Sequence, residues 1–263
     1  MKKKNKNIKI FVVTHKEYKM PDNEIYLPIQ VGAEGKKDLG FLKDNTGENI
    51  SLKNPNYCEL TAMYWAWKNY ECDYIGLNHY RRYFTLKSKK EIKKSDDIFD
   101  NILNENDVQN LMEQYDVVVS NKLHLLGKTM ETKYKQQHYI SDLEITKKVI
   151  SDMYPEYMES YETAMNKHEM SICNMFIMKK DLFDEYCEWL FNILFEVEKH
   201  TNIENYSTLQ KRIYGFIAER LLNVWLEYHK ELKIGTAQIL SLEHDDLKTI
   251  IKKSYRRVLH IKS

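Results

Sequence analysis

The sequence predicts a mixed α/β domain with a helical C-terminal part. Short β-branched runs alternate with longer amphipathic segments along the 263 residues, which is the pattern of a sheet covered by helices. A hydrophobic content of 43% and an aromatic content of 12% are typical of a folded globular chain. Several predicted strands end in polar or basic residues, and ligands bind at the carboxyl ends of strands in open α/β sheets. We therefore expect a binding site at one edge of the sheet.

Overall charge and cysteine content argue against a nucleic-acid-binding protein, a disulfide-stabilised protein and a zinc protein. Forty basic and 39 acidic residues leave a net charge of +1, which argues against a nucleic-acid partner. The four cysteines are far apart and form no C-x-x-C pair, so they indicate reduced thiols rather than a disulfide frame or a zinc site. No apolar run approaches the roughly 18 residues that cross a bilayer, and the basic residues 1–4 precede no signal core. We expect a cytoplasmic protein.

The chain opens with two extended segments. Residues 8–13 form a β-branched run that turns polar at Thr14, His15 and Lys16. Many nucleotide-binding α/β domains begin with such a strand. Residues 26–31 predict a second extended segment, whose proline indicates an edge strand or a loop.

A long loop and a helix follow. Residues 32–56 hold four of the eight glycines, and a turn-rich loop of this length is usually functional or mobile. The sequence contains neither G-x-G-x-x-G nor a phosphate-binding loop motif, so it gives no support for dinucleotide or P-loop chemistry. A helix is predicted from about Tyr57 to Tyr70, with Asn54 or Asn56 as its cap.

The most informative stretch is residues 73–84. Its apolar start, 73–77, predicts a buried strand, and polar and basic residues follow at once. These include His79, Arg81 and Arg82. Two adjacent guanidiniums at a strand end would suit a phosphate-bearing ligand, because Arg offers forked donors that match phosphate oxygens. The alternative is a surface strand end whose arginines pair with nearby carboxylates.

The rest of the chain continues the alternation of strands and helices. Residues 121–140 predict a mixed loop whose lysines and histidines either fold over a negatively charged ligand or are simply solvated. The other predicted elements are a charged stretch 87–97 leading into a helix to about Gln114, a strand at 116–120, a helix from about Ser141, a strand at 172–178, long helices at about 180–199 and 207–229, and a last extended segment at 235–240.

Three polar residues of this region are candidate site residues. His138 and Asp142 are four apart near a predicted helix start, a spacing that puts both on one helix face. Such a pair would be a general base with its orienting partner, two metal ligands or a surface hydrogen bond. Asn174 interrupts the apolar run 172–178, and a buried Asn needs hydrogen-bond partners. It is therefore either a structural bridge or a ligand contact.

Both ends of the chain are basic. Residues 1–9 carry five lysines and no acid, and residues 248–263 carry six Lys or Arg and no acid. Apolar residues at helical spacing make the segment 247–263 a predicted basic amphipathic helix. It would lie on an anionic membrane surface or pack its apolar stripe against the body of the protein.

Several motifs together resemble one known family. The most specific are Glu59-Leu-Thr61 with Tyr64-Trp-Ala-Trp-Lys-Asn69, and Gly76-Leu-Asn-His-Tyr-Arg-Arg-Tyr-Phe84. Weaker matches are Thr14-His15-Lys16, Gly47-Glu-Asn-Ile-Ser51, Asn174-Met-Phe176 and the run from Arg212 to Arg220. Over residues 8 to about 240 the chain resembles the bacterial capsule and exopolysaccharide family that was long filed as a domain of unknown function and later assigned as galactofuranosyltransferases.

This resemblance implies a GT-A-like, Rossmann-like nucleotide-sugar-binding fold as a single domain over residues 1–263. It implies transfer of galactofuranose from UDP-galactofuranose, with inversion, to a glycan acceptor in capsular polysaccharide, exopolysaccharide or O-antigen biosynthesis. The acceptor would be a lipid-linked oligosaccharide on undecaprenyl diphosphate. The basic segment 247–263 would then hold the enzyme peripherally at the inner face of the cell membrane.

The resemblance also implies a donor site. Many GT-A enzymes carry an Asp-x-Asp metal motif after the strand that corresponds to 73–77, whereas this chain carries His79, Arg81 and Arg82 there. These cations would offset the charge of the leaving diphosphate in place of a divalent ion. The full donor-binding set is Thr14, His15, Lys16, Asn49, His79, Arg81, Arg82 and Asn174.

An inverting transfer needs a group that takes the proton of the acceptor hydroxyl. Asp142, oriented by His138, is the first candidate for this base, and Glu219 is the second. No residue is assigned to a metal and no cofactor is firmly implied, with Mn²⁺ or Mg²⁺ left open.

Besides a membrane-scaffolding role led by the basic segment 247–263, which would leave the His and Arg cluster unexplained, two other functions stay open at this point. One is a transferase that uses another nucleotide-activated sugar on the same fold. The other is a non-catalytic partner that binds a nucleotide sugar or glycan in a polysaccharide assembly complex. Loss of Asp142 and Glu219 would abolish activity in an enzyme but would be tolerated in a binding partner.

Overall fold

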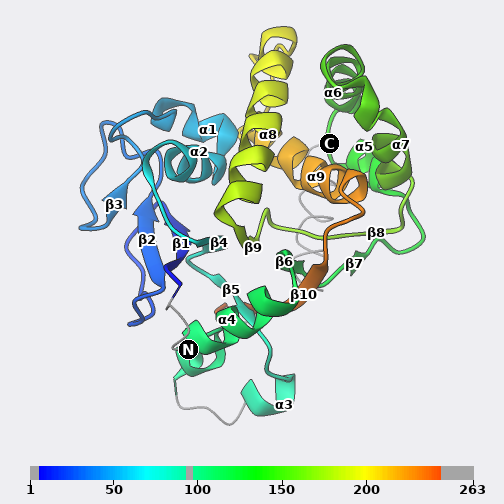
Figure 1. Cartoon of the computed structure of the whole chain (residues 1–263). Helices are drawn as coiled ribbons and strands as arrows, with labels where there is room; N and C mark the ends of the chain where they lie inside the picture. Colours follow the sequence, from blue (N-terminus) through cyan, green and yellow to red (C-terminus); the bar gives the residue numbers. More distant parts are fainter. Residues whose placement is uncertain (1–5, 93–96, 244–263) are drawn as a thin grey trace.

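A computed structural model gives the structure of the protein and describes residues 6–92 and 97–243. Within these residues a mixed eight-stranded sheet carries helices on both faces, which confirms the predicted α/β class (Figure 1). The large sheet consists of β1 (Ile8–Thr14), β2 (Tyr26–Gln30), β3 (Leu42–Lys43), β4 (Tyr74–His79), β5 (Arg82–Thr85), β6 (Val117–Ser120), β9 (Phe176–Lys179) and β10 (Ile234–Ser241), and the strands β7 (Leu123–His124) and β8 (Glu169–Met170) form a small separate sheet.

The strand order brings distant parts of the chain together. Strand β1 is parallel to both β2 and β4, with Phe11 in register with Leu27 and Leu77. Strand β9 runs antiparallel to β4 and to β6. Strand β10 is parallel to β6 and antiparallel to β5. Because β1 and β4 are parallel neighbours, the residues that follow them emerge at the same edge of the sheet.

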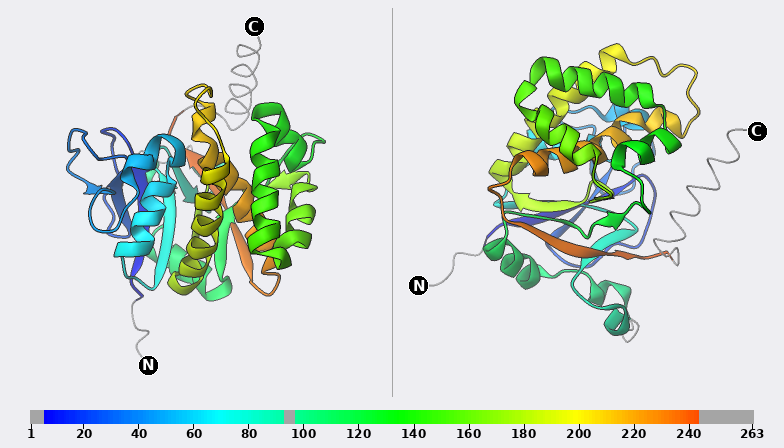
Figure 2. Two further views of the ribbon diagram at one scale, coloured as in Figure 1. Left: turned by 90° about the horizontal axis from the view of Figure 1, so that it is seen from above. Right: turned by 90° about the vertical axis from the view of Figure 1, so that its right-hand side faces the viewer.

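Helices cover both faces of this sheet, as the views in Figure 2 show. Side chains of β1 point alternately to the two faces. Phe11 and Val13 belong to the larger core, beneath α2, α8 and α9, whereas Ile10 and Val12 belong to a second core beneath α4. The helices are α1 (Asn54–Tyr57), α2 (Leu60–Asn69), α3 (Lys89–Ile92), α4 (Glu105–Gln114), α5 (Met130–Gln137), α6 (Ile140–Met153), α7 (Met158–Met165), α8 (Lys180–His200) and α9 (Ile213–Tyr228), and short 3-10 turns cover Ser51–Lys53, Ile98–Asn101, Pro155–Tyr157 and Gln210–Arg212.

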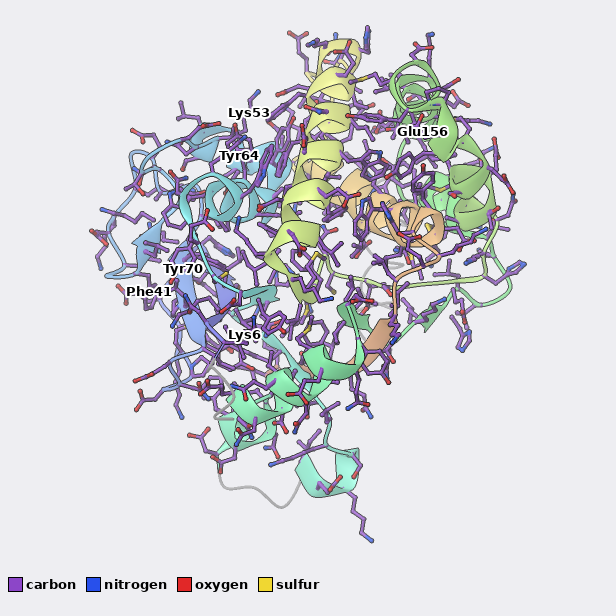
Figure 3. The ribbon with its side chains drawn as sticks, viewed as in Figure 1. Lys6, Phe41, Lys53, Tyr64, Tyr70 and Glu156 are labelled. Carbon is purple, nitrogen blue, oxygen red and sulfur yellow. The ribbon has the colours of Figure 1, made fainter. Side chains whose placement is uncertain are left out.

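Aromatic side chains join α2 to α8. Tyr64 of α2, labelled in Figure 3, packs edge-on against Phe191 of α8, and the two ring centroids are 5.0 Å apart. Trp67 stacks on the same Phe191 ring at an interplanar angle of 5°. The indole Nε1 of buried Trp65 donates to the carbonyl of Thr46 at 2.8 Å. These contacts fix α2 and therefore the position of its N-terminal end.

Most predicted elements are confirmed within one or two residues. This holds for the strands predicted at 8–13, 116–120 and 235–240 and for the helix at 180–199. Among the helices of the described residues, none has the length and apolar character to cross a bilayer. The predicted amphipathic segment 247–263 lies outside the described residues.

The structure corrects several other predicted boundaries. The region 121–140 is not a loop throughout, because it contains β7 and α5. The predicted strand 172–178 begins only at Phe176, since the preceding residues form a tight irregular turn. Strand β5 was not predicted at all, because its main partner, β10, lies about 150 residues further along the chain.

The pairing of β2 shows why Pro28 is tolerated inside a strand that is not at the edge of the sheet. Pro28 lies within β2, which is not an edge strand, since β3 pairs on its far side. Strand β3 is only two residues long and pairs with Ile29 and Gln30 alone. Pro28 therefore faces no strand on that side that would require an amide donor.

Close packing around Gly76 gives a stability prediction. An added Cβ at Gly76 in β4 would lie 3.0 Å from the Phe176 carbonyl oxygen and 3.1 Å from Cγ1 of Ile10. We expect Gly76→Ala to lower the free energy of unfolding by about 1–3 kcal/mol, as overpacking in cores does. Urea denaturation would measure this.

The matched control is Gly215→Ala in α9. Its added Cβ meets only ordinary contacts, the nearest at 3.5 Å from Cys58, and Ala favours helix over Gly by about 1 kcal/mol. This variant should be neutral or more stable than the wild type. Equal effects of the two substitutions would contradict the packing described for β4.

Candidate functional site

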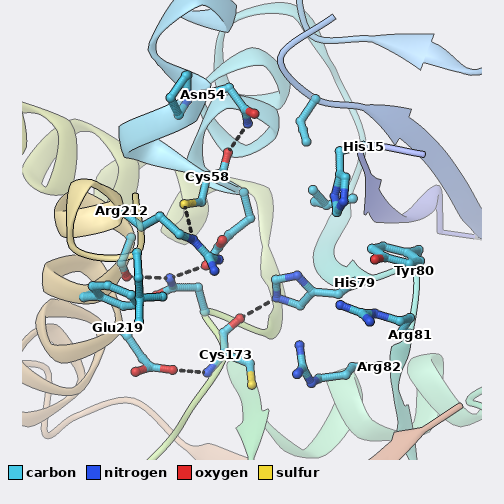
Figure 4. A pocket seen from close by; sticks show the side chains of 18 of the residues that line it. His15, Asn54, Cys58, His79, Tyr80, Arg81, Arg82, Cys173, Arg212 and Glu219 are labelled. Atoms are coloured by element: carbon cyan, nitrogen blue, oxygen red, sulfur yellow. Dashed lines mark hydrogen bonds between the residues drawn. The ribbon is translucent and has the colours of Figure 1, made fainter. Parts of the chain in front are cut away.

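A cavity of about 580 Å³ opens at the carboxyl ends of β1 and β4 (Figure 4). Its walls come from several parts of the chain: the ends of β1 and β4 and the residues after β1, β2 and β4, the junction of α1 and α2, the end of α5, the segment before β9, and the start of α9 with the residues before it. This is the sheet edge at which open α/β proteins bind ligands. The size suits a small organic ligand.

A break between α1 and α2 shapes one wall. Cys58 has φ 54° and ψ −126°, which no helix accommodates, so the predicted helix 57–70 is divided there. The side chain of Asn54 holds the break by donating to the Cys58 carbonyl at 2.8 Å. Glu59 then occupies the N-cap position of α2, but its side chain makes no capping bond and instead lines the cavity.

The segment before β9 forms a second strained wall. Cys173 and Asn174 have φ 71° and φ 49°. Among the described residues four non-glycine residues have positive φ, and three of them, Cys58, Cys173 and Asn174, line this cavity. Strained backbone of this kind concentrates at functional sites, where the surrounding structure enforces it.

Side chains from α9 and from the α1–α2 junction enforce this strained conformation. Glu219 accepts a hydrogen bond from the Cys173 amide at 2.6 Å, and its other carboxylate oxygen pairs with Arg220 at 2.8 Å. Nδ2 of Asn174 donates to Glu59 at 2.7 Å and to the Gly215 carbonyl at 3.1 Å. Asn174 is thus the bridge that the sequence suggested, and it also lines the cavity.

His79 ends β4 with a defined tautomer. Its Nε2 lies 2.7 Å from the carbonyl oxygen of Cys173, and since a carbonyl only accepts, Nε2 carries the proton. Burial lowers the pKa of His79, although the charge of Glu59 and the bond to Cys173 oppose this shift. The ring is therefore neutral at pH 7, which leaves its Nδ1 as an acceptor.

The arginines at this site differ in their partners. Arg81 is neutralised by Glu243, which its Nη1 contacts at 2.7 and 2.8 Å. Arg82 forms no ion pair in the described part of the chain, and its Nε is buried without a partner. Arg212 also forms no ion pair with a carboxylate there, and its Nε donates to the thiol of Cys58 at 3.1 Å.

A second buried polar atom also lacks a partner within the described residues. Oδ1 of Asn174 accepts no hydrogen bond, although this side chain is only 3% exposed. Buried polar atoms without a partner are uncommon in native structures, so each calls for an explanation such as a bound ligand or water. Asn174 and Arg82 thus offer an acceptor and a donor to one ligand.

The residues after β1 flank the cavity opening. His15 packs edge-on against Tyr80 with ring centroids 5.5 Å apart, and both line the cavity. Burial and the neighbouring charge of Lys16 lower the pKa of His15. The Nζ of Lys16 lies 5.4 Å from the centroid of the Tyr80 ring, and Lys16 does not line the cavity. Thr14 closes the turn by donating to the Lys16 carbonyl at 2.6 Å.

The predicted pairing of His138 with Asp142 is wrong. His138 is the C-cap of α5 with extended backbone, and α6 begins only at Ile140, so the two residues do not share a helix face. Nδ1 of His138 contacts Gln210 at 2.9 Å. The Asp142 carboxylate instead accepts from the hydroxyl of Tyr206 at 2.7 Å.

The environments of these two residues also differ. Burial and the charge of Arg220 lower the pKa of His138 to about 3, so its ring stays neutral. His138 lines the cavity, and its ring stacks on that of Phe216 with centroids 4.1 Å apart. Asp142 is buried but does not line the cavity. The catalytic role of Asp142 stays a prediction that no contact in the structure supports.

The structure brings most of the predicted site residues together. Those lining the cavity are His15, His79, Arg81, Arg82, His138, Asn174 and Glu219, and those outside it are Thr14, Lys16, Asn49 and Asp142. Asn49 forms a local turn, accepting from the Ser51 amide at 3.1 Å and donating to the Gly47 carbonyl at 2.9 Å. It therefore shapes the 32–56 loop.

Several cavity residues were missed as site residues, among them Cys58, Glu59 and Arg212. These three lie outside the 73–84 stretch, and only the fold brings them to it. The available signal was the presence of Glu59 and Arg212 in motif blocks.

Within the described residues, no group of three or more His, Cys, Asp or Glu side chains is arranged to hold a metal ion.

The burial of Asp142 gives a prediction about pH. Burial raises the pKa of this carboxyl to about 6, while the bond from Tyr206 opposes the shift. The folded state thus holds the proton more tightly than the unfolded state, so this group's contribution to stability falls as pH rises from about 4 to about 6. Asp142→Asn should therefore gain on the order of 1 kcal/mol relative to the wild type between pH 4 and pH 7.

Urea denaturation at several pH values would measure this gain. The control is Asp152→Asn on the same helix, where the carboxylate is 60% exposed and pairs with Lys148. A difference between Asp142→Asn and the wild type that does not change with pH would contradict the buried position of Asp142.

Comparison with known proteins relates this geometry to other chains. No curated protein sequence matches the chain. The fold is similar to that of WbbM, a bifunctional glycosyltransferase, in its apo structure, at 33% sequence identity and a TM-score of 0.82. The match covers 90% of this chain and 46% of the WbbM chain, so this chain spans about half the length of that protein. A family model described as a domain of unknown function, DUF4422, matches residues 9–231, and the chain belongs to this family.

Proposed function

We propose that this protein is a glycosyltransferase with a GT-A-like fold. It transfers galactofuranose from UDP-galactofuranose, with inversion, to a glycan acceptor in the biosynthesis of a bacterial surface polysaccharide. The similarity to a bifunctional glycosyltransferase over 90% of this chain supports transfer of a sugar. The motif blocks that resemble galactofuranosyltransferases support the choice of donor.

The observation that carries this proposal is the pair of guanidiniums in the cavity that form no direct ion pair among the described residues. Arg82 and Arg212 both line it, and neither has a carboxylate partner among the described residues. Arg82 is half-buried and Arg212 is exposed, and an anionic ligand at the cavity would pair with both charges. A diphosphate meets this need, because its oxygens match the forked donors of Arg.

The neighbouring groups suit the remaining parts of a nucleotide sugar. The free Oδ1 of Asn174 accepts a hydrogen bond from a sugar hydroxyl, and the unprotonated Nδ1 of His79 accepts another. Arg82 and Arg212 stabilise the charge that develops on the leaving diphosphate. Arg81 contributes less than the sequence suggested, because Glu243 already neutralises it.

The acceptor belongs to a larger assembly in this proposal. A lipid-linked oligosaccharide presented at the inner membrane face would reach the cavity, and the basic segment 247–263 would hold the protein at the anionic surface. That segment lies outside the described residues, so its role rests on the sequence alone.

The donor assay tests the function directly. Purified protein incubated with UDP-galactofuranose should bind it and slowly release UDP with water as the acceptor, whereas UDP-galactopyranose should be left intact. Because arginines take the role of a divalent ion in this proposal, excess EDTA should leave the rate unchanged. UDP release and the sugar product would both be followed by chromatography.

Each alternative has its own outcome in this assay. Preference for the pyranose would keep a transferase fold and overturn the donor. Loss of turnover with EDTA and recovery with Mn²⁺ would contradict the role given to the arginines. Absence of binding to either nucleotide sugar would contradict the proposed function.

The arginine proposal predicts a loss of nucleotide affinity. Arg82→Met and Arg212→Met should each weaken UDP binding about 10- to 100-fold, since a hydrogen bond to a charged group contributes about 1.5–3 kcal/mol. Isothermal titration calorimetry with UDP would measure the change. Lys148→Met, which removes an exposed cation of α6 outside the cavity, is the control and should bind UDP as the wild type does. Unchanged affinity in both arginine variants would place the diphosphate elsewhere.

A further inference from the structure

The proposed transfer needs a proton acceptor that faces the cavity, and the described lining residues include two carboxylates, Glu59 and Glu219. A general base must lie within hydrogen-bond reach of the hydroxyl it activates, so geometry comes before acidity in choosing between them. The surroundings of the two carboxylates differ in a way that separates a structural role from a chemical one.

Both oxygens of Glu219 are already engaged. Oε1 accepts the Cys173 amide at 2.6 Å, and Oε2 accepts Arg220 at 2.8 Å. Taking up a proton at either oxygen would break a short contact to a donor. Glu219 therefore holds the strained segment before β9 in place and is poorly arranged to act as a base.

Only one oxygen of Glu59 is engaged. Its Oε1 accepts from Asn174 at 2.7 Å, while no donor among the described residues contacts Oε2. The contact with Asn174 fixes the orientation of the carboxylate, so the second oxygen has a defined position at the cavity wall. The break at Cys58 supplies this placement, because a continuous helix would turn residue 59 differently.

The histidines of the cavity are weaker candidates for the base. Burial lowers the pKa of His15, His79 and His138, so each takes a proton less readily than an ordinary imidazole. His15 also lies beside the cations Lys16 and Arg81, which disfavour a further positive charge. Asp142 does not line the cavity.

We propose that Glu59 is the general base of the transfer, an inference that rests on the proposed function. The acceptor hydroxyl oxygen forms a bond to the anomeric carbon while the bond from that carbon to the β-phosphate oxygen of the donor breaks. The electron pair of the broken bond leaves with UDP, next to Arg82 and Arg212. The hydroxyl proton passes to Oε2 of Glu59. Asn174 is the positioning residue that holds this carboxylate.

Two substitutions of Glu59 separate a base from a structural carboxylate. Glu59→Gln keeps the length of the side chain and an oxygen that accepts from Asn174, but it takes up no proton. Glu59→Asp keeps a carboxylate but shortens it, which weakens the contact with Asn174. A structural role therefore predicts that the aspartate variant is the worse of the two, and a catalytic role predicts the reverse.

The experiment measures UDP release from UDP-galactofuranose, with water as the acceptor, for the wild type and both variants. Glu59→Gln should lose about 100-fold or more in rate, the contribution typical of a general base, while its affinity for UDP stays within a few-fold of the wild type. Glu59→Asp should retain more activity than Glu59→Gln, and the fall of the wild-type rate at low pH should be absent from the residual rate of the glutamine variant.

The possible outcomes distinguish failure of the role given to Glu59 from failure of the proposed function. An active wild type with an active Glu59→Gln, or with Glu59→Asp as the weaker variant, overturns the role of Glu59 and leaves the proposed function standing. Loss of both turnover and UDP binding in Glu59→Gln also overturns it in favour of a structural role. A wild type that neither binds UDP nor consumes UDP-galactofuranose overturns the proposed function and this inference with it.

Discussion

The hydrogen bonds of the Asn174 side chain join three segments on which the whole cavity depends. Its Nδ2 reaches Glu59 at the start of α2 and the Gly215 carbonyl in α9, while its own backbone belongs to the segment before β9. These contacts hold Asn174 at φ 49°. Because a left-handed residue other than Gly is costly, the packing of α2, α8 and α9 must supply the compensating stability. The site is therefore as rigid as the junction of these helices.

The arginines around this junction fall into two groups. Those of the first group form ion pairs, Arg81 with Glu243 and Arg220 with Glu219. Those of the second group, Arg82 and Arg212, form no ion pair with a carboxylate in the described part of the chain. Paired charges of the first kind fix side chains in place, whereas unpaired charges of the second kind favour an anion. One edge of the sheet thus combines side chains held in place by ion pairs with arginines that favour an anionic ligand.

The sequence predicted well those features that depend on local pattern. Buried strands such as 8–13 and the long helix at 180–199 have periodicity that tertiary contacts do not override. The break at Cys58 was not predictable, since residues 57–70 have a helical pattern and the break is held by the side chain of Asn54. The pairing of His138 with Asp142 failed for a related reason: a spacing of four residues brings side chains together only within one continuous helix. Strained backbone and distant contacts, which carry much of this site, leave little trace in local sequence.

The late position of β9 in the chain has a consequence for assembly. Strand β9 joins β4 to β6 only after about 180 residues have been synthesised, α9 adds its cavity residues later, and β10 completes the sheet last. Contacts over such sequence distances form slowly, because the loop entropy is lost before they are made. In a nascent or partly opened chain the residues of the proposed anion site are therefore not yet brought together, and binding of the proposed ligand would be linked to the complete fold. Occupancy of the cavity would in this sense report that the described part of the chain has folded.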